Sequence, residues 1–188
     1  LRRAVEQTSP NNPVLRDYVT HVSYLLSTEL ALHSAKGGEK FLAERRKEGK
    51  SEDEIERYRR EQSLRAHLMN GLLPVAHIAR LLRDWNAPRL RYFDERAYRL
   101  FCAGFTLHDW LKLPEVEKWL DEQGLDHSKV NPAKHLLLIE DIFRQWIGRL
   151  GLDEFLKPIG GIEDWLHDLI YIACNTQVRW GTMLRLDA

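Results

Sequence analysis

The stretch that decides the fold covers residues 131–150 and reads NPAKHLLLIEDIFRQWIGRL. Asn131 followed by Pro132 places a helix N-cap ahead of a first-turn proline. Apolar side chains then recur at helical spacing and share one face with a histidine in the opening turn: His135, Leu138, Ile139, Ile142, Phe143 and Trp146. The pattern predicts a helix over 132–150 with one strongly apolar face.

Helical spacing extends on both sides of this stretch. It predicts further helices over 14–33, 64–83, 95–112 and 162–176, with Pro74 implying a kink or boundary in the second of them. No hairpin dipeptide separates alternating runs, and no cluster of β-branched residues is long enough for a sheet. The sequence therefore predicts an all-α helical bundle.

Residues 37–62 form a charged insertion in this bundle. Within them, ERRKEGKSEDEIERYRRE at 44–61 is dense in both charges and poor in apolar anchors. Pairs at i,i+4, Asp53 to Arg57 and Glu56 to Arg60, favour a solvated helix in the second half. We expect a single domain over 1–188 that carries an exposed insertion and is a fragment of a larger multidomain protein.

Composition excludes little. The chain has 28 basic and 28 acidic residues, so global charge identifies no nucleic-acid partner, although a local basic face stays open. Cys102 and Cys174 lie in apolar runs, as buried thiols of a reducing compartment do. We find no signal peptide and no apolar run of membrane-spanning length, and therefore expect a cytoplasmic protein that does not enter a membrane.

The sequence FTLHDWLK at 105–112 contains the principal candidate site. On a helix, His108 shares a face with Gly104 and Phe105, so it points to the packed side, where the glycine lets another helix approach. Asp109 lies about 100° further round, at the edge of that face. An acid there is costly to bury unless it is paired or bound to a cation. Lys112, one turn on, would neutralise that acid or hold a substrate phosphate.

Two more histidines lie on apolar helix faces. His67 precedes Gly71 by one turn, with His77 as a rival beyond Pro74, and His135 opens the third helix. Each alone is more often a core or capping residue than a ligand. Together they predict a metal site made of His67, His108, Asp109 and His135. Imidazole with carboxylate suits Mn, Fe, Ni, Co or Zn, or Mg with more oxygen ligands, and such sites hydrolyse phosphoesters through an activated water.

The remaining histidines are weaker candidates. His21 and His33 fit surface or packing positions, and His127 fits a loop. The second His-Asp pair, His167-Asp168, shares a face with acidic and aromatic residues and is more often an exposed pair than a ligand set.

An inward His67, then LHDWLK at 107–112, then His135 resembles the pattern of the HD superfamily of metal-dependent phosphohydrolases. The resemblance implies a helical bundle with one or two divalent ions (Mn, Ni, Co, Mg or Fe). It implies that His67, His108, Asp109 and His135 are metal ligands and that Asp109 and Lys112 are catalytic. Asp109 would be the bridging ligand if two ions bind.

SLRAHLMNGLLPV at 63–75, together with LHDWLK, is most similar to the N-terminal HD domain of the type I-D CRISPR large subunit. That likeness implies a nuclease that degrades single-stranded or unwound invader DNA beside other subunits of an RNA-guided complex and a separate helicase. The region IYIACNTQVRWG at 170–181 lacks the His-His pair that two-metal relatives have. His167, Asp168, Asn175 and Asp187 are unmatched substitutes, so the number of ions stays open.

Three hypotheses follow. The first is a metal-dependent DNA phosphodiesterase whose strand is tracked by basic residues such as Arg65, Lys134 or Arg179. The second is a nucleotide phosphohydrolase of the same superfamily, for which no base or ribose reader is visible. The third is a catalytically weak or inactive structural domain, in which the His-Asp motif is a polar part of the core. Metal content and strand cleavage separate the three.

Overall fold

The computed structural model describes residues 12–30, 38–61, 63–72, 94–126 and 129–183, and no β-strand occurs within these ranges. The labelled helices are α2 (Pro13–Tyr18), the π-helical turn η1 (Val19–Ser23), α3 (Tyr24–Glu29), α4 (Gly38–Lys47), α5 (Glu52–Glu61), α7 (Glu95–Leu107), the 3-10 turn η3 (Trp110–Lys112), α8 (Pro114–Glu122), α9 (Pro132–Arg149), α10 (Leu152–Leu156), the 3-10 turn η5 (Lys157–Ile159) and α11 (Leu166–Met183). Residues 64–72 are also helical. The predicted all-α class is confirmed for this part of the chain.

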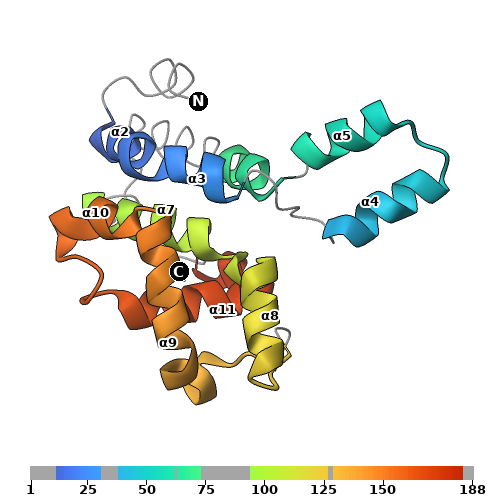
Figure 1. The fold of residues 1–188 in the computed structure, drawn as a ribbon. Coiled ribbons are helices and arrows are strands. Elements are labelled where there is room, and N and C mark those ends of the chain that lie inside the picture. The colour runs from blue at the N-terminus through green and yellow to red at the C-terminus, as the bar shows by residue number, and fades with distance from the viewer. Residues whose placement is uncertain (1–11, 31–37, 62, 73–93, 127–128, 184–188) are drawn as a thin grey trace.

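Helix α7 is central to the fold. It packs against α2, α10 and α11, while α9 packs against α10 and α11 (Figure 1). Tyr98, Cys102, Ala103 and Leu107 are the buried apolar side chains of α7. Cys102 is thus a buried free thiol, as predicted. None of the helices in the described ranges has the length and apolarity needed to cross a membrane.

Gly104 lets α7 and α11 approach closely, as the sequence predicted. A Cβ at this position would lie 2.8 Å from Cγ2 of Ile172 on α11, closer than real carbon contacts. Because the side chain of Ile172 packs directly on the α7 backbone at Gly104, the C-terminal half of α7 lies close against α11. This end of α7 carries His108 and Asp109.

The predicted helix over 14–33 is present as a continuous run from α2 through η1 to α3, and residues 31–33 lie outside the described ranges. Asn12 caps it, because its Oδ1 accepts the N–H of Leu15 at 3.0 Å. Buried side chains at helical spacing, among them Leu15, Tyr18 and Val22, hold it against the core.

Helix α9 begins and ends almost where the sequence placed it. Asn131 Oδ1 accepts the N–H of Ala133 at 2.9 Å, and Pro132 occupies the first turn. Ile139, Phe143 and Trp146 are buried as expected, but Leu138 is 38% exposed. The buried stripe also includes Ile147, so the helix is rotated slightly from the face that the sequence indicated.

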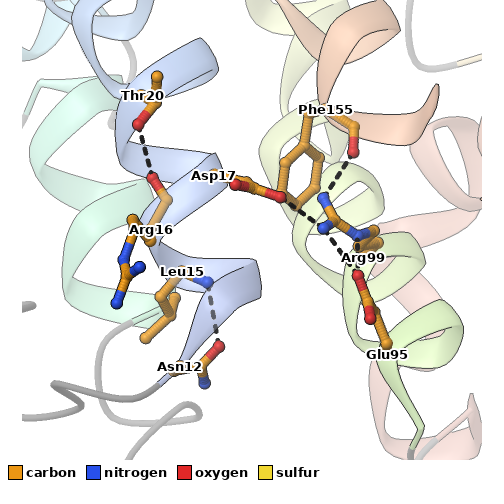
Figure 2. Close-up of polar contacts among 8 residues, drawn as sticks. All are labelled: Asn12, Leu15, Arg16, Asp17, Thr20, Glu95, Arg99 and Phe155. Carbon is orange, nitrogen blue, oxygen red and sulfur yellow. Dashed lines mark hydrogen bonds and ion pairs between the residues drawn. The ribbon is translucent and has the colours of Figure 1, made fainter. Parts of the chain in front are cut away.

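A buried arginine ties three segments together (Figure 2). The guanidinium of Arg99 on α7 donates to Asp17 Oδ2 on α2 at 2.5 Å and to the backbone oxygen of Phe155 on α10 at 2.8 Å. It also donates to Glu95 Oε1 at 2.8 and 2.9 Å. The residue is only 2% exposed, so its charge is held by these partners rather than by water.

The charged insertion is a helical hairpin. Helices α4 and α5 pack against each other and lie to one side of the other helices (Figure 1), and the helix predicted in the second half is confirmed as α5. Its small apolar centre contains Leu42 and Ile55, both at most 2% exposed, which are separate from the main core cluster. The ring of Phe41 meets that of Tyr58 edge-on at 6.1 Å.

Ion pairs cover the hairpin surface. They join Arg46 Nε to Glu52 Oε1 at 3.1 Å and Lys50 Nζ to Glu54 Oε1 at 3.2 Å. The side chain of Glu54 also accepts the N–H of Ser51 at 3.1 Å, so Ser51 and Glu54 together cap the start of α5. Each exposed pair adds little to stability, and together they keep a hairpin with few apolar residues solvated.

Candidate metal centre

The first member of the site, His67, stands on the helix of residues 64–72. Ser63 caps this helix, because its hydroxyl accepts the N–H of Ala66 at 3.1 Å. Leu64 and Leu68 are 1% exposed and Leu72 is 3% exposed, so this i, i+4, i+8 stripe faces the core. His67 directly precedes Leu68 of this stripe, and its side chain is 45% exposed. The histidine therefore lies at the border between core and solvent.

The second part of the site is a break in the chain rather than a helix face. The predicted helix over 95–112 ends at Leu107, and the 3-10 turn begins at Trp110. His108 keeps helical angles, but Asp109 has φ −108° and ψ 12°. Neighbours on a regular helix point about 100° apart, so a continuous helix would separate these two side chains. The break allows both to point to one place.

The three polar groups converge there. The Nε2 atoms of His67 and His108 are 3.0 Å apart. Asp109 Oδ2 lies 3.5 Å from Nε2 of His67 and 3.4 Å from Nε2 of His108. The structure thus brings together three of the four residues predicted to bind metal, and they form a His-His-Asp group that could hold an ion.

A backbone carbonyl sets the protonation of His108. Its Nδ1 lies 2.5 Å from the oxygen of Phe105, which can only accept, so Nδ1 carries the proton. In a neutral ring Nε2 then carries a lone pair, and this atom faces His67 and Asp109. A ligating histidine typically donates its other N–H to a carbonyl or carboxylate in this way.

The spacing of the three atoms fits an ion. The point equidistant from them lies about 1.9 Å from each, which is close to the bonds of about 2.0–2.2 Å that such ligands make to a divalent ion. Among the described residues, such an ion would be held by His67, His108 and Asp109.

The electrostatic setting favours a cation. Asp109 is only 8% exposed, and a carboxylate at such a place is stabilised by a neighbouring positive charge. The site also lies at the C-terminal end of α7, where the last carbonyls of a helix carry partial negative charge. Two neutral imidazoles and one carboxylate would leave one net positive charge on a divalent ion for substrate oxygens.

His135 is not a member of the His-His-Asp group. Its Nδ1 accepts the backbone N–H of Asn131 at 3.0 Å, so it acts as a second cap at the start of α9. The sequence pattern allowed His135 to be either a capping residue or a metal ligand. The role of His135 as a ligand stays a prediction.

The second His-Asp pair lies elsewhere on the surface. His167 and Asp168 are exposed, and Nε2 of His167 is 4.0 Å from Glu140 Oε2 on α9. Other candidates lie outside the described residues (His33, His77, His127 and Asp187) or have side chains outside the description (Lys112, Asn175 and Arg179). Their predicted roles stay predictions.

Sequence reasoning missed the contribution of the Phe105 main chain. The pattern indicates Phe105 only as an inward side chain of the His108 face. The available signal was its position three residues before His108 near a helix end, where carbonyls lack intrahelical partners and a following imidazole can donate to one.

No protein-family model, no curated protein and no solved structure matches this chain significantly. The geometry alone therefore defines the class: an all-α protein with a His-His-Asp group, open on the His67 side, that could hold a divalent metal ion.

Proposed function

We propose that the chain is a metal-dependent DNA phosphodiesterase, built as the HD-type resemblance of its sequence implies. The observation that carries the proposal is the convergence of two imidazole Nε2 atoms and Asp109 Oδ2 within 3.5 Å, with the tautomer of His108 set by a carbonyl. A purely structural histidine pair does not require a nearly buried carboxylate as its third member.

In this proposal His67, His108 and Asp109 hold a divalent ion such as Mn, Fe, Co, Ni or Mg. When bound, the ion lowers the pKa of a coordinated water and offsets charge on the phosphoryl oxygens. The Phe105 carbonyl keeps the His108 Nε2 lone pair directed inward. The predicted part of Lys112 is to offset charge on the same oxygens.

An extended strand suits the exposure of the site better than a small enclosed substrate. His67 is the open edge, with nearly half of its side chain accessible. Arg65 on the same helix is exposed, and so is Lys134 near the start of α9. Exposed basic side chains of this kind are suited to contact the backbone of single-stranded DNA. The proposal extends to a type I-D CRISPR complex, in which a separate helicase supplies the unwound strand.

A structural domain is the second candidate, and one contact favours it. Without an ion, His67 Nε2–H can donate to the His108 Nε2 lone pair at the observed 3.0 Å, so the pair has a hydrogen bond of its own. In that case the motif would be a polar contact between two helices. Metal content distinguishes the candidates.

The test is cleavage of end-labelled single-stranded DNA by the purified chain with Mn, Ni, Co or Mg added, and with bound metal quantified. The test variant is His108→Ala/Asp109→Ala, and the matched control is His167→Ala/Asp168→Ala, which removes the exposed His-Asp pair. We expect metal-dependent cleavage in wild type and control and its loss in a folded test variant.

Other outcomes decide against the proposal. A wild type that takes up no metal supports the structural candidate. Turnover of mononucleotides with no action on long strands would indicate the small-molecule phosphohydrolase. Equal activity in all three proteins would place the chemistry away from His108 and Asp109.

A further inference from the structure

A glycine leaves room for an aromatic ring behind the metal centre. Gly71 lies one turn after His67 on the 64–72 helix. A Cβ on Gly71 would lie 2.1 Å from Cζ and 2.5 Å from Cε1 of Phe105. Carbon atoms do not approach this closely, so the ring of Phe105 occupies the space that any other residue at 71 would fill.

The ring of Phe105 also supports His108. The two rings stack with centroids 4.7 Å apart and an interplanar angle of 29°. Phe105 also stacks with Phe101, with centroids 5.9 Å apart and an interplanar angle of 25°. The His67 ring is 6.4 Å away. Phe105 therefore fills the space between the 64–72 helix and α7, directly beside both imidazoles.

His108 is thus held at two points by one residue. The carbonyl of Phe105 binds Nδ1, and its ring lies against the face of the imidazole. Together these contacts set the plane of the His108 ring and the direction of Nε2. Because the ring of Phe105 also touches Gly71, it sets the distance between the helices that carry the two histidines.

We propose that Gly71 and Phe105 are positioning residues of the metal centre, acting through His108 and through the spacing of the two histidine-bearing helices. This inference rests on the proposed metal site and assigns neither residue a contact with the ion. A ligand set tolerates misplacement of only about 0.5 Å, so the shift of about 1 Å by which the ring must yield to a Cβ 2.1 Å away is sufficient to disturb it.

The direction of the disturbance follows from the packing. An alanine at 71 pushes the ring of Phe105 toward His108, or pushes the 64–72 helix and His67 outward. In either case the 3.0 Å separation of the Nε2 atoms changes. A smaller side chain at 105 removes the clash, so the two substitutions should compensate each other.

The experiment measures Mn²⁺ affinity of the full chain by isothermal titration calorimetry. It compares wild type, Gly71→Ala, Phe105→Leu and the double variant. Gly148→Ala is the matched control, because a Cβ on this helical glycine of α9 would meet no atom within 4 Å apart from its chain neighbours and its own helix backbone. We expect Gly71→Ala to weaken binding about 10–100-fold, as loss of ligand-supporting contacts does, and Phe105→Leu to weaken it less. The double variant should recover most of the loss caused by Gly71→Ala.

A second readout does not depend on metal. The ¹⁵N shifts of the His108 ring in the apo protein report its tautomer, and Gly71→Ala should move them while Gly148→Ala should not. If Gly71→Ala fails to fold, Phe105→Leu and the double variant still test the inference through both readouts.

The outcomes separate this inference from the proposed function. Wild-type affinity in Gly71→Ala, or losses that simply add in the double variant, would overturn the positioning role while leaving the metal site intact. Absence of Mn²⁺ binding by wild type would overturn the metal site. The histidine shifts would then decide whether Gly71 and Phe105 still set the His108 ring.

Discussion

Replacing Arg99 by Met should destabilise the protein by about 2–5 kcal/mol. The methionine keeps most of the buried apolar stem but removes the guanidinium. The backbone oxygen of Phe155 loses a buried 2.8 Å donor, which costs about 1–3 kcal/mol. Asp17 and Glu95 are 39% and 53% exposed, so their carboxylates regain water, and each lost pair costs about 0.5–1 kcal/mol.

The assay is urea unfolding followed by circular dichroism, with thermal unfolding as a check. A loss of about 3 kcal/mol lowers the Tm of a chain of this size by about 6–12 °C. Asp17→Asn is the control, because Arg99 keeps its other two partners, and we expect a loss below about 1 kcal/mol. A loss below about 1 kcal/mol for Arg99→Met, or an equal loss for both variants, would refute the reasoning that the orphaned carbonyl dominates.

Three further predictions concern stability. Burial raises the pKa of the Cys174 thiol to about 12, so the folded state keeps it protonated while the unfolded chain ionises above about pH 8.5. The stability contributed by this thiol is fully present below about pH 8.5 and falls by up to about 1.4 kcal/mol per pH unit as pH rises toward 12. The unfolding free energy of Cys174→Ala, measured by urea titration, should therefore fall less steeply at alkaline pH than that of wild type. Parallel pH curves for the two proteins would contradict this. Gly151→Ala should cost about 2 kcal/mol or more, since Gly151 has φ 67° and a Cβ there would lie 2.2 Å from the backbone oxygen of His21. A Tm within 1–2 °C of wild type corresponds to a loss of only about 0.5 kcal/mol and would disprove that clash. Tyr18→Phe removes the buried 2.6 Å bond to the Thr106 hydroxyl and should cost about 1 kcal/mol in chemical denaturation, whereas a gain in stability would show that the bond contributes nothing.

Periodicity and capping chemistry predicted much of the fold. Asn131 with Pro132 located the start of α9, and Gly104 indicated a close helix approach that Ile172 provides. These predictions succeeded because they depend on local backbone chemistry or on the absence of one side chain. The exposure of Leu138 was not predictable from a helical wheel, because tertiary packing selects which edge of an apolar face is covered.

The candidate site was only partly predictable. Helical spacing predicted the inward placement of His108, whose side chain is 12% exposed, but it also predicted an inward His67, whose side chain is 45% exposed. His135 satisfied the same criterion and caps its own helix. The deciding feature is the end of α7 at Leu107, which allows His108 and Asp109 to converge. No glycine or proline marks that position in the sequence, so the pattern favoured a longer helix.

The hairpin of α4 and α5 should unfold locally at a lower free-energy cost than the main helical core. Its apolar centre around Leu42 and Ile55 is small and lies apart from the main cluster, so breaking it exposes little surface and leaves the larger core intact. Amide protons of the hairpin should therefore exchange with solvent through local fluctuation, whereas those beside Phe143 in α9 exchange only when the whole chain opens. The same separation makes the tip at Gly49 a tolerant place to insert a probe or lengthen the chain, since α4 and α5 can accommodate the change without disturbing the centre at His108.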